Sequence, residues 1–188
     1  MNTHLTRCAW LNKDSLYIKY HDEEWGVPVH EDQKMFEFLL LETFQAGLSW
    51  FTILKKRENF REAFAKFDYQ EVAAFSASKI EELMDNFGII RNRQKINAAV
   101  NNAQQFMEIQ KEFGSFCDYI WGFVDHKPIV NKPKTLAQVP ATSPISDALS
   151  KDLKRRGFKF VGSTTIYAHM QACGMVNDHT TDCFRFGQ

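Results

Sequence analysis

The 188-residue chain lacks a net charge, with 23 Lys and Arg residues against 23 Asp and Glu residues. This balance argues against a protein held to nucleic acid by overall charge, although a few well-placed cations suffice for a local contact with phosphates. The chain also lacks a long apolar run, because the longest, FEFLLL at 36–41, contains Glu37 and is far too short to span a membrane. Its first residues, MNTHLTRCAW, contain no apolar signal-peptide core, so we expect a cytoplasmic protein with no membrane contact.

Cysteine is scarce, at four residues, and in a cytosolic protein these are expected to be thiols or metal ligands rather than disulfides. The chain has no phosphate-binding G-x-x-x-x-G-K-[ST] loop, no G-x-S-x-G nucleophile elbow and no H-E-x-x-H metalloprotease motif. These absences argue against the corresponding classes of enzyme.

Helical spacing of apolar residues dominates what is present. Apolar side chains recur three and four residues apart at 80–87, 96–107 and 145–153, and residues 32–46 and 49–66 are predicted to form two more helices. No segment alternates as strands in hairpins do. The length suits one domain, 1–188. We therefore expect an all-α fold, with two helical lobes joined near a proline-containing connector at 125–144.

The predicted helix ends follow from capping residues. Asp32 and Ser49 are candidate N-caps, and Ser78 with Glu81 matches a capping box for a helix that ends at Gly88. Two further helices are expected to end at Gly114 and Gly157, because glycine adopts the left-handed conformation that terminates helices.

Four potential metal ligands stand at the two ends of the chain: Cys8, His21, His179 and Cys183. Two imidazoles and two thiolates make a complete tetrahedral zinc set, and His179 and Cys183 would share one face of a helix. Because the set is split across the whole chain, spacing alone also allows a capping histidine and buried cysteines.

Four aromatic residues, Trp10, Tyr20, Trp25 and Trp50, form a second candidate cluster. Aromatic rings can wall a pocket for a planar base and attract a cation, and they equally fill hydrophobic cores.

Glu42 is the most informative single residue, because it follows FEFLLL on the same predicted helix. Its helical neighbours Phe38, Leu39 and Ala46 are apolar, so the carboxylate is expected to point toward the core. Such a group is costly unless it is paired or binds a ligand. A structural pair with an arginine or a backbone N–H is the alternative interpretation.

Residues 154–172 place a glycine-containing turn between two helical patterns. Gly157 and Gly162 suit a hairpin whose backbone N–H groups approach a phosphate. The chain's one concentrated basic cluster lies beside it, and such clusters are also often solvated helix faces: Lys151, Lys154, Arg155, Arg156 and Lys159.

Several long segments are similar to one known family: YHDEEWGVP (20–28), QAGLSWFTILKKRENFREAF (45–64), GIIRNRQKI (88–96), SDALSKDLKRRGFKFVGSTT (146–165) and MQACGMVNDH (170–179). Together they resemble the 3-methyladenine DNA glycosylase I family of the helix-hairpin-helix glycosylase superfamily. The resemblance covers residues 7–183 in order, and it implies an all-α helix-hairpin-helix fold that acts on double-stranded DNA containing alkylated bases.

The resemblance also implies roles for individual residues. Cys8, His21, His179 and Cys183 would hold one structural zinc ion that joins the N- and C-terminal segments. Glu42 and Tyr20 would hydrogen-bond the alkylated base, Trp50 would stack on it, and Trp10 and Trp25 would line the pocket. Gly47 and Leu48 would plug the gap left by the extruded nucleotide, and the hairpin at 158–163, with Gly162 and the flanking Lys154, Arg155 and Lys159, would anchor the DNA.

Two positions depart from the expected pattern. Thr43 stands where many relatives have Gly and could alter the pocket wall. Asn177, in VNDH, occupies the apparent position of the aspartate that many helix-hairpin-helix glycosylases use.

These roles predict a monomeric, monofunctional glycosylase that hydrolyses the N-glycosidic bond of 3-methyladenine and releases the free base. The base already carries a positive charge and leaves as a neutral molecule, so a strong general acid is not required. A zinc-clasped module that binds damaged DNA without cutting a bond is the alternative, and a carboxylate among apolar neighbours argues against it. A zinc hydrolase is a third class, and four protein ligands would leave no position for water.

Overall fold

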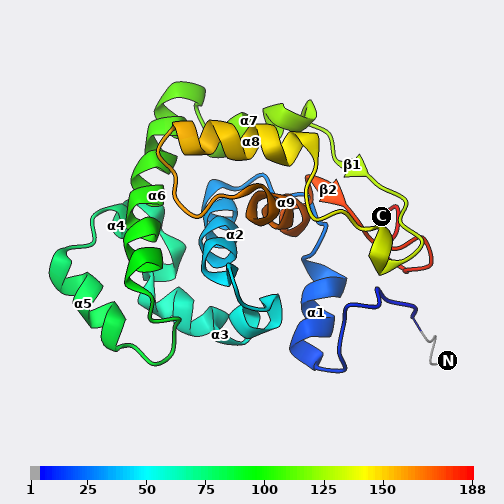
Figure 1. Ribbon diagram of the computed structural model, residues 1–188, viewed down its shortest axis with the longest axis horizontal. Helices are drawn as coiled ribbons and strands as arrows, with labels where there is room; N and C mark the ends of the chain where they lie inside the picture. Colours follow the sequence, from blue (N-terminus) through cyan, green and yellow to red (C-terminus); the bar gives the residue numbers. More distant parts are fainter. Residues whose placement is uncertain (1–4) are drawn as a thin grey trace.

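The computed structural model describes residues 5–188, and this part of the chain is mostly helical (Figure 1). The helices are α1 (Ser15–Glu23), α2 (Asp32–Gln45), α3 (Trp50–Ala63), α4 (Tyr69–Ala73), α5 (Ala77–Asp85), α6 (Arg93–Phe113), α7 (Phe116–Trp121), α8 (Pro144–Arg155) and α9 (Ser163–Ala172). Short 3-10 helices are η1 (Ala65–Phe67), η2 (Gly122–Val124) and η3 (Leu136–Gln138), and the strands are β1 (Ile129–Val130) and β2 (Val176–Asn177). Among the described residues, no helix is long and apolar enough to cross a membrane.

Helix α2 lies at the centre, with α9 beside it, α3 below and the long α6 along one side (Figure 1). All residues of α2 from Met35 to Phe44 are buried, which explains why its apolar run is continuous rather than periodic. One hydrophobic cluster extends from Cys8 to Cys183. The helices therefore pack around one shared hydrophobic core.

The proline-containing segment 125–144 connects η2 to α8 and includes β1, which pairs in parallel with β2, Ile129 opposite Val176. The beginning of the described chain and the C-terminus lie on this side of the molecule (Figure 1). The expectation of no strands thus failed at one two-residue pair, which is too short to produce an alternating pattern.

Several predicted helix ends are confirmed and others are wrong. The Ser49 side chain accepts a hydrogen bond from the Thr52 N–H, and Gly114 ends α6 with a φ of 89°. Ser76, not Ser78, caps α5. That helix ends at Asp85, and Phe87 lies beyond it with 78% of its surface exposed, so the predicted stop at Gly88 is also late.

The predicted N-cap role of Asp32 is wrong as well, because Glu31 precedes α2. The Asp32 carboxylate instead accepts hydrogen bonds from the backbone N–H groups of Phe116 (2.9 Å) and Cys117 (2.8 Å). It therefore satisfies donors in the first turn of α7, a long-range partner that local sequence cannot reveal.

Candidate functional site

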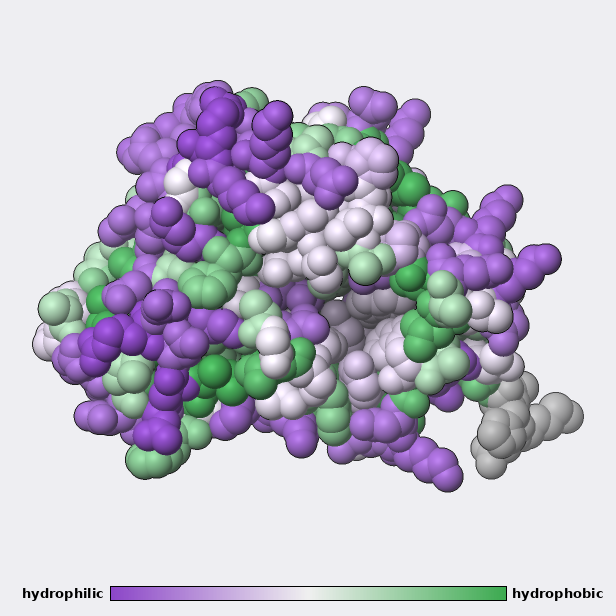
Figure 2. Space-filling model, in the orientation of Figure 1, coloured by the Kyte–Doolittle hydropathy of each residue, from purple (hydrophilic) through white to green (hydrophobic). Residues whose placement is uncertain are grey.

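A cavity of about 200 Å³ opens among α1, α2, α3 and α9. The hollow near the centre of the face in Figure 2 lies at this place. Pockets for drug-sized ligands start at roughly 300 Å³, so this volume suits a smaller, compact ring system. The cavity is lined by Trp10, Tyr17, Tyr20, Trp25, Glu42, Gln45, Trp50, Leu136, Val139, Ala168 and Gln171.

The predicted aromatic cluster does form the walls of this cavity. The ring centroids of Tyr20 and Trp50 are 5.3 Å apart, and those of Trp10 and Trp25 are 5.0 Å apart. The indole N–H of Trp50 is buried and has no hydrogen-bond partner among the described residues. The walls thus offer π faces to a planar ligand, and one buried donor is left unsatisfied.

Glu42 is the acidic residue of the cavity, and it is only 4% exposed. Its Oε2 atom is buried without a hydrogen-bond partner within residues 5–188. Burial raises the pKa of this carboxyl from 4.5 to about 8. The structural pair that the sequence left open is therefore absent, and the group is poised to receive a donor or a cation from a ligand.

Glu37 lies on the same helix, is 3% exposed and, unlike Glu42, is paired with cations. Its oxygens accept from Arg57 (2.7 Å), Arg61 (2.9 Å) and Lys34 (3.1 Å). Burial acts to raise its pKa, yet these cations hold it below its ordinary value. One helix thus carries a neutralised structural carboxylate and an unpaired one that faces a cavity.

The surroundings of Glu42 were only partly predictable. Phe38 and Leu39 are buried as expected, whereas Ala46 lies beyond the end of α2 and is exposed. Thr43 is fully buried, and its hydroxyl donates to the Leu40 carbonyl of its own helix (2.7 Å). It does not line the cavity, so this departure does not place a new polar group in the pocket.

Asn177 does not line the cavity either, and its side-chain oxygen accepts from the His179 N–H at 3.1 Å. The neighbouring Asp178 is 1% exposed and accepts from Asn131, Tyr167 and Gln171, each at 2.7 Å. In the described part of the chain, Glu42 is thus the carboxylate available to a ligand in the cavity.

Sequence reasoning missed several lining residues. Tyr17 lies one turn before Tyr20 on α1, so helical spacing could have found it. Leu136 and Val139 come from the segment 125–144 and could not be placed from local pattern. The same holds for Gln45, Ala168 and Gln171.

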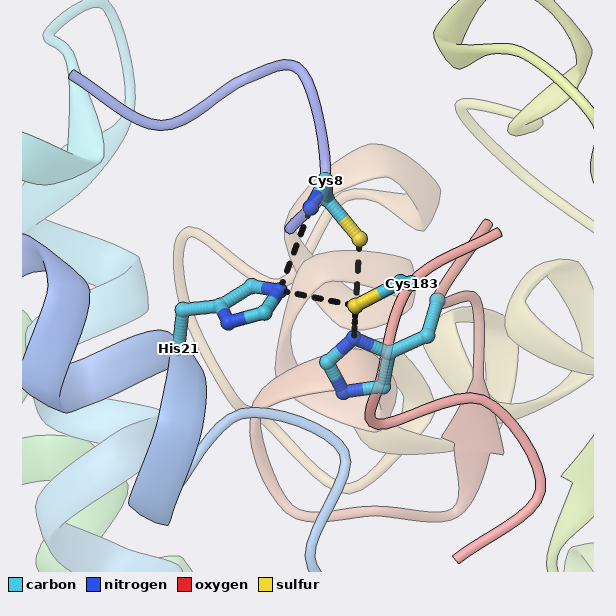
Figure 3. Close-up of side chains that lie close together, drawn as sticks. Cys8, His21 and Cys183 are labelled. Atoms are coloured by element: carbon cyan, nitrogen blue, oxygen red, sulfur yellow. Dashed lines mark hydrogen bonds between the residues drawn. The ribbon is translucent and has the colours of Figure 1, made fainter. Parts of the chain in front are cut away.

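Cys8, His21, His179 and Cys183 meet as predicted, all buried and with their ligand atoms within 4.8 Å of one another. The expected helix is wrong, because His179 and Cys183 lie in a non-helical segment after β2. Figure 3 shows Cys8, His21 and Cys183 converging from the N-terminal segment, α1 and the C-terminal segment. The Cys183 sulfur lies 3.5 Å from His21 Nε2 and 3.6 Å from His179 Nδ1, and the Cys8 sulfur lies 3.5 Å from His179 Nδ1. Ordinary zinc–sulfur and zinc–nitrogen bonds at tetrahedral angles give a sulfur-to-nitrogen separation of about 3.6 Å.

The remaining ring nitrogens have partners that favour metal binding. His21 Nδ1 donates to Asp22 (2.8 Å), which Arg7 holds at 2.7 Å, and His179 Nε2 donates to the Trp25 carbonyl at 3.1 Å. These bonds leave His21 Nε2 and His179 Nδ1 as the unprotonated ring nitrogens that can bind a metal. Burial lowers the pKa of His179 to about 4, which keeps the imidazole neutral. The donor set therefore fits a four-coordinate zinc ion, with no position left for water.

The aromatic wall joins the cavity to the metal cluster. The rings of Trp25 and His179 are 4.6 Å apart, and those of Trp10 and His21 are 5.3 Å apart. The metal cluster thus lies behind the wall, where a bound ion would fix Trp10 and Trp25.

The wedge loop, residues 46–49, lies between α2 and α3 at the rim of the cavity. Gln45 and Trp50, which flank it, both line the cavity. Leu48 is 41% exposed, and Gly47 has a φ of 83°, a conformation that favours glycine. The loop therefore presents an apolar tip beside the cavity mouth.

The hairpin predicted at 154–172 is present as the end of α8, a turn and α9. Gly157 has a φ of 94°, and Gly162 precedes α9 with no side-chain cap on the first N–H groups of that helix. These donors are available to an anion.

The basic cluster beside the hairpin is partly neutralised. Arg155 and Arg156 pair with Asp152, and Arg156 also pairs with Glu112. Lys154 and Lys159 are exposed and form no ion pair among the described residues. Lys151 is likewise exposed and has no ion pair within residues 5–188, so these three lysines are the unpaired cations of the cluster.

Comparison with known proteins agrees with this geometry. A family model described as methyladenine glycosylase matches residues 10–186. The chain is 50% identical to DNA-3-methyladenine glycosylase 1 of Escherichia coli and 52% identical to DNA-3-methyladenine glycosylase of Haemophilus influenzae, in each case over 95% of this chain and 96% of the relative.

Solved structures agree as well. A crystal structure of 3-methyladenine DNA glycosylase I superposes with a TM-score of 0.94 at 50% identity, covering 96% of this chain and all of that one. A structure of the Staphylococcus aureus enzyme, solved for the basis of its 3-methyladenine recognition, has a TM-score of 0.92 at 38% identity and covers 96% of each chain. The chain belongs to the methyladenine glycosylase family.

Proposed function

We propose that this protein excises 3-methyladenine from alkylated double-stranded DNA by hydrolysing its N-glycosidic bond, which leaves an abasic site. The observation that carries the proposal is the unpaired carboxyl of Glu42 inside an aromatic-walled cavity. A module that only bound the DNA backbone would not need the buried Glu42 carboxyl, because burying this group without a partner destabilises the fold. The relatives named for this activity support the same conclusion.

In this proposal, the cavity acts mainly by selecting the charged base. 3-Methyladenine in DNA is cationic, so it stabilises the ionised form of Glu42, and Tyr20 supplies a second hydrogen-bonding group. Trp50 offers a ring face that attracts the cation. Neutral adenine gains less from the carboxylate and has a stronger glycosidic bond, so it is rejected both in binding and in chemistry.

Bond cleavage then proceeds by simple hydrolysis. The leaving base is neutral, so the cavity does not need a strong acid, and water attacks the sugar. No lysine of the described chain lines the cavity, so we propose no Schiff-base intermediate and no strand cleavage.

The DNA contacts in this proposal come from two exposed loops. Leu48, supported by Gly47, enters the gap left when the nucleotide swings out, and the exposed apolar tip supports that role. The hairpin of α8 and α9 acts as the helix-hairpin-helix anchor, with phosphates bound by Lys154, Arg155, Lys159 and the N–H groups that follow Gly162.

We also propose that Cys8, His21, His179 and Cys183 hold one structural zinc ion. The ligand separations and the partners of both imidazoles support this assignment. The ion would close the single domain by tying the first and last segments together, and it would supply stability rather than chemistry.

The test is to incubate the protein with a methylated duplex and to assay strand breaks before and after alkali. We expect alkali-labile abasic sites at methylated adenines and intact strands before alkali. Strand breaks without alkali would contradict simple hydrolysis, and the absence of abasic sites would contradict glycosylase activity.

A further inference from the structure

Helix α6 holds both loops that are proposed to contact DNA. The Nζ atom of Lys95 donates to the carbonyls of Phe44 (2.8 Å) and Ala46 (2.6 Å). These carbonyls lie where α2 ends and the wedge loop begins. Lys95 is only 6% exposed, so its ammonium is committed to this contact rather than to solvent.

This contact replaces a cap that α2 lacks. The last turn of α2 contains no basic residue, and the final carbonyls of a helix need donors and favour a nearby cation. The buried ammonium supplies both. Without Lys95, the carbonyls of Phe44 and Ala46 would lose their charged partner. That partner fixes the point at which the chain leaves α2, and therefore the direction in which Leu48 projects.

The hairpin is held by the same helix. The Asn102 side chain accepts from the Lys159 N–H (2.8 Å) and donates to the Lys159 carbonyl (3.0 Å), while Asn101 donates to the Gly157 carbonyl (2.9 Å). Asn102 is 3% exposed. Its side-chain amide thus hydrogen-bonds both the N–H and the carbonyl of Lys159, which fixes the turn against α6.

Lys95 and Asn102 are seven residues apart, so they lie on the same face of α6, about 10 Å apart along its axis. A groove lies on this part of α6, lined by Gln94, Asn97, Ala98, Asn101, Lys159 and Phe160, with no acidic side chain to repel a phosphate backbone.

We propose that Lys95 and Asn102 are positioning residues that fix the wedge loop and the hairpin at one spacing along α6, so that Leu48 enters the base stack where the hairpin holds the phosphates. This proposal rests on the proposed function, because it requires the wedge and the anchor. Neither residue lines the base cavity, so both act on the duplex rather than on the free base.

The test is a double-mutant cycle of Lys95→Met with Leu48→Ala. Met keeps the apolar stem and removes the ammonium. We expect each single change to slow single-turnover excision from duplex DNA about ten- to a hundredfold, since small misplacements of positioning groups cost this much. We expect the double variant to be no slower than Leu48→Ala alone, because Lys95 acts through the wedge. Affinity for free 3-methyladenine should change less than twofold.

Asn102→Leu tests the contact between α6 and the hairpin, and it remains informative if Lys95→Met fails to fold. We expect weaker binding to undamaged duplex and a shallower salt dependence, with free-base affinity retained. The matched control is Lys111→Met, also on α6, whose side chain is 67% exposed and pairs with Glu108. It should alter neither measurement.

Independent losses from Lys95→Met and Leu48→Ala, or a parallel loss of free-base affinity, would overturn the positioning role and leave the proposed function intact. An unchanged salt dependence in Asn102→Leu would overturn the role at the hairpin. If Leu48→Ala excises the base from duplex DNA at the full rate, Leu48 is not a wedge and Lys95 has no wedge to position. The proposed glycosylase activity would remain supported. A wild-type protein that excises nothing would refute the proposed function itself.

Discussion

Replacing Glu42 by Gln is expected to stabilise the folded protein and to weaken its activity. The pKa of the Glu42 carboxyl rises from 4.5 to about 8 because the group is buried without a partner. Between these two values the folded state holds a proton that the unfolded chain releases, so the free energy of unfolding falls as the pH rises. At pH 7 this cost is at most about 3.5 kcal/mol, at about 1.4 kcal/mol for each pH unit above the ordinary pKa.

Glutamine has nearly the same shape and does not titrate. The Glu42→Gln variant should therefore melt at a higher temperature than the wild type at pH 7 to 8. This difference should disappear below about pH 4, where Glu42 is mostly protonated in both states. Thermal melts over this pH range measure the effect.

Glu37→Gln is the matched control, because it is the same substitution on the same buried helix. Glu37 pairs with Arg57 at 2.7 Å, and removing one partner of a buried pair costs about 3–5 kcal/mol. This variant should melt at a lower temperature at neutral pH. If Glu42→Gln is also destabilised at pH 8, Glu42 has a structural partner and the reasoning fails.

The activity of Glu42→Gln should change in the opposite direction from its stability. A hydrogen bond to a charged group contributes about 1.5–3 kcal/mol, so we expect roughly ten- to hundredfold slower excision. Wild-type kcat/KM should rise with pH, with its midpoint near 8, and level off above that value as Glu42 ionises, whereas the Gln variant should show no such rise. Unchanged excision would make Glu42 structural, and complete loss of turnover with normal base binding would make it a general base.

The other predictions concern zinc and DNA. Elemental analysis should find one zinc ion per chain, and Cys8→Ser should lower both metal content and melting temperature; full zinc in that variant would exclude the four-ligand site. Leu48→Ala should slow excision from duplex DNA more than it weakens binding of the free base, whereas equal losses would contradict its role as a wedge. Replacing Lys154, Arg155 and Lys159 together should weaken binding to abasic and undamaged DNA alike and flatten its salt dependence. An unchanged salt slope would place the DNA surface elsewhere.

The sequence predicted most of the helices because apolar spacing is a local property. It did not predict that Asp32 accepts hydrogen bonds from the first turn of α7, more than eighty residues away. It also did not predict the pairing of β1 with β2. Such features depend on which surfaces meet in the folded chain. The exposed Phe87 satisfied a helical spacing by chance, because α5 ends before it.

The candidate site was predictable where chemistry singled out a residue. Glu42 was conspicuous as an acidic residue among apolar neighbours, and the structure confirms its burial. The metal cluster is convincing only in three dimensions, since its members stand at opposite ends of the chain. Gln171 and Val139 carry no local signal, and Lys95 is one lysine among many until its carbonyl partners are seen.

The central claim is that the cavity removes a methylated base from DNA, and the most direct measurement is the free base released from a duplex with one 3-methyladenine under excess protein. We predict release of one 3-methyladenine per lesion and no adenine from the matched undamaged duplex. Tight binding of the lesion duplex without release of any base would contradict the account and would make the protein a damage-binding module.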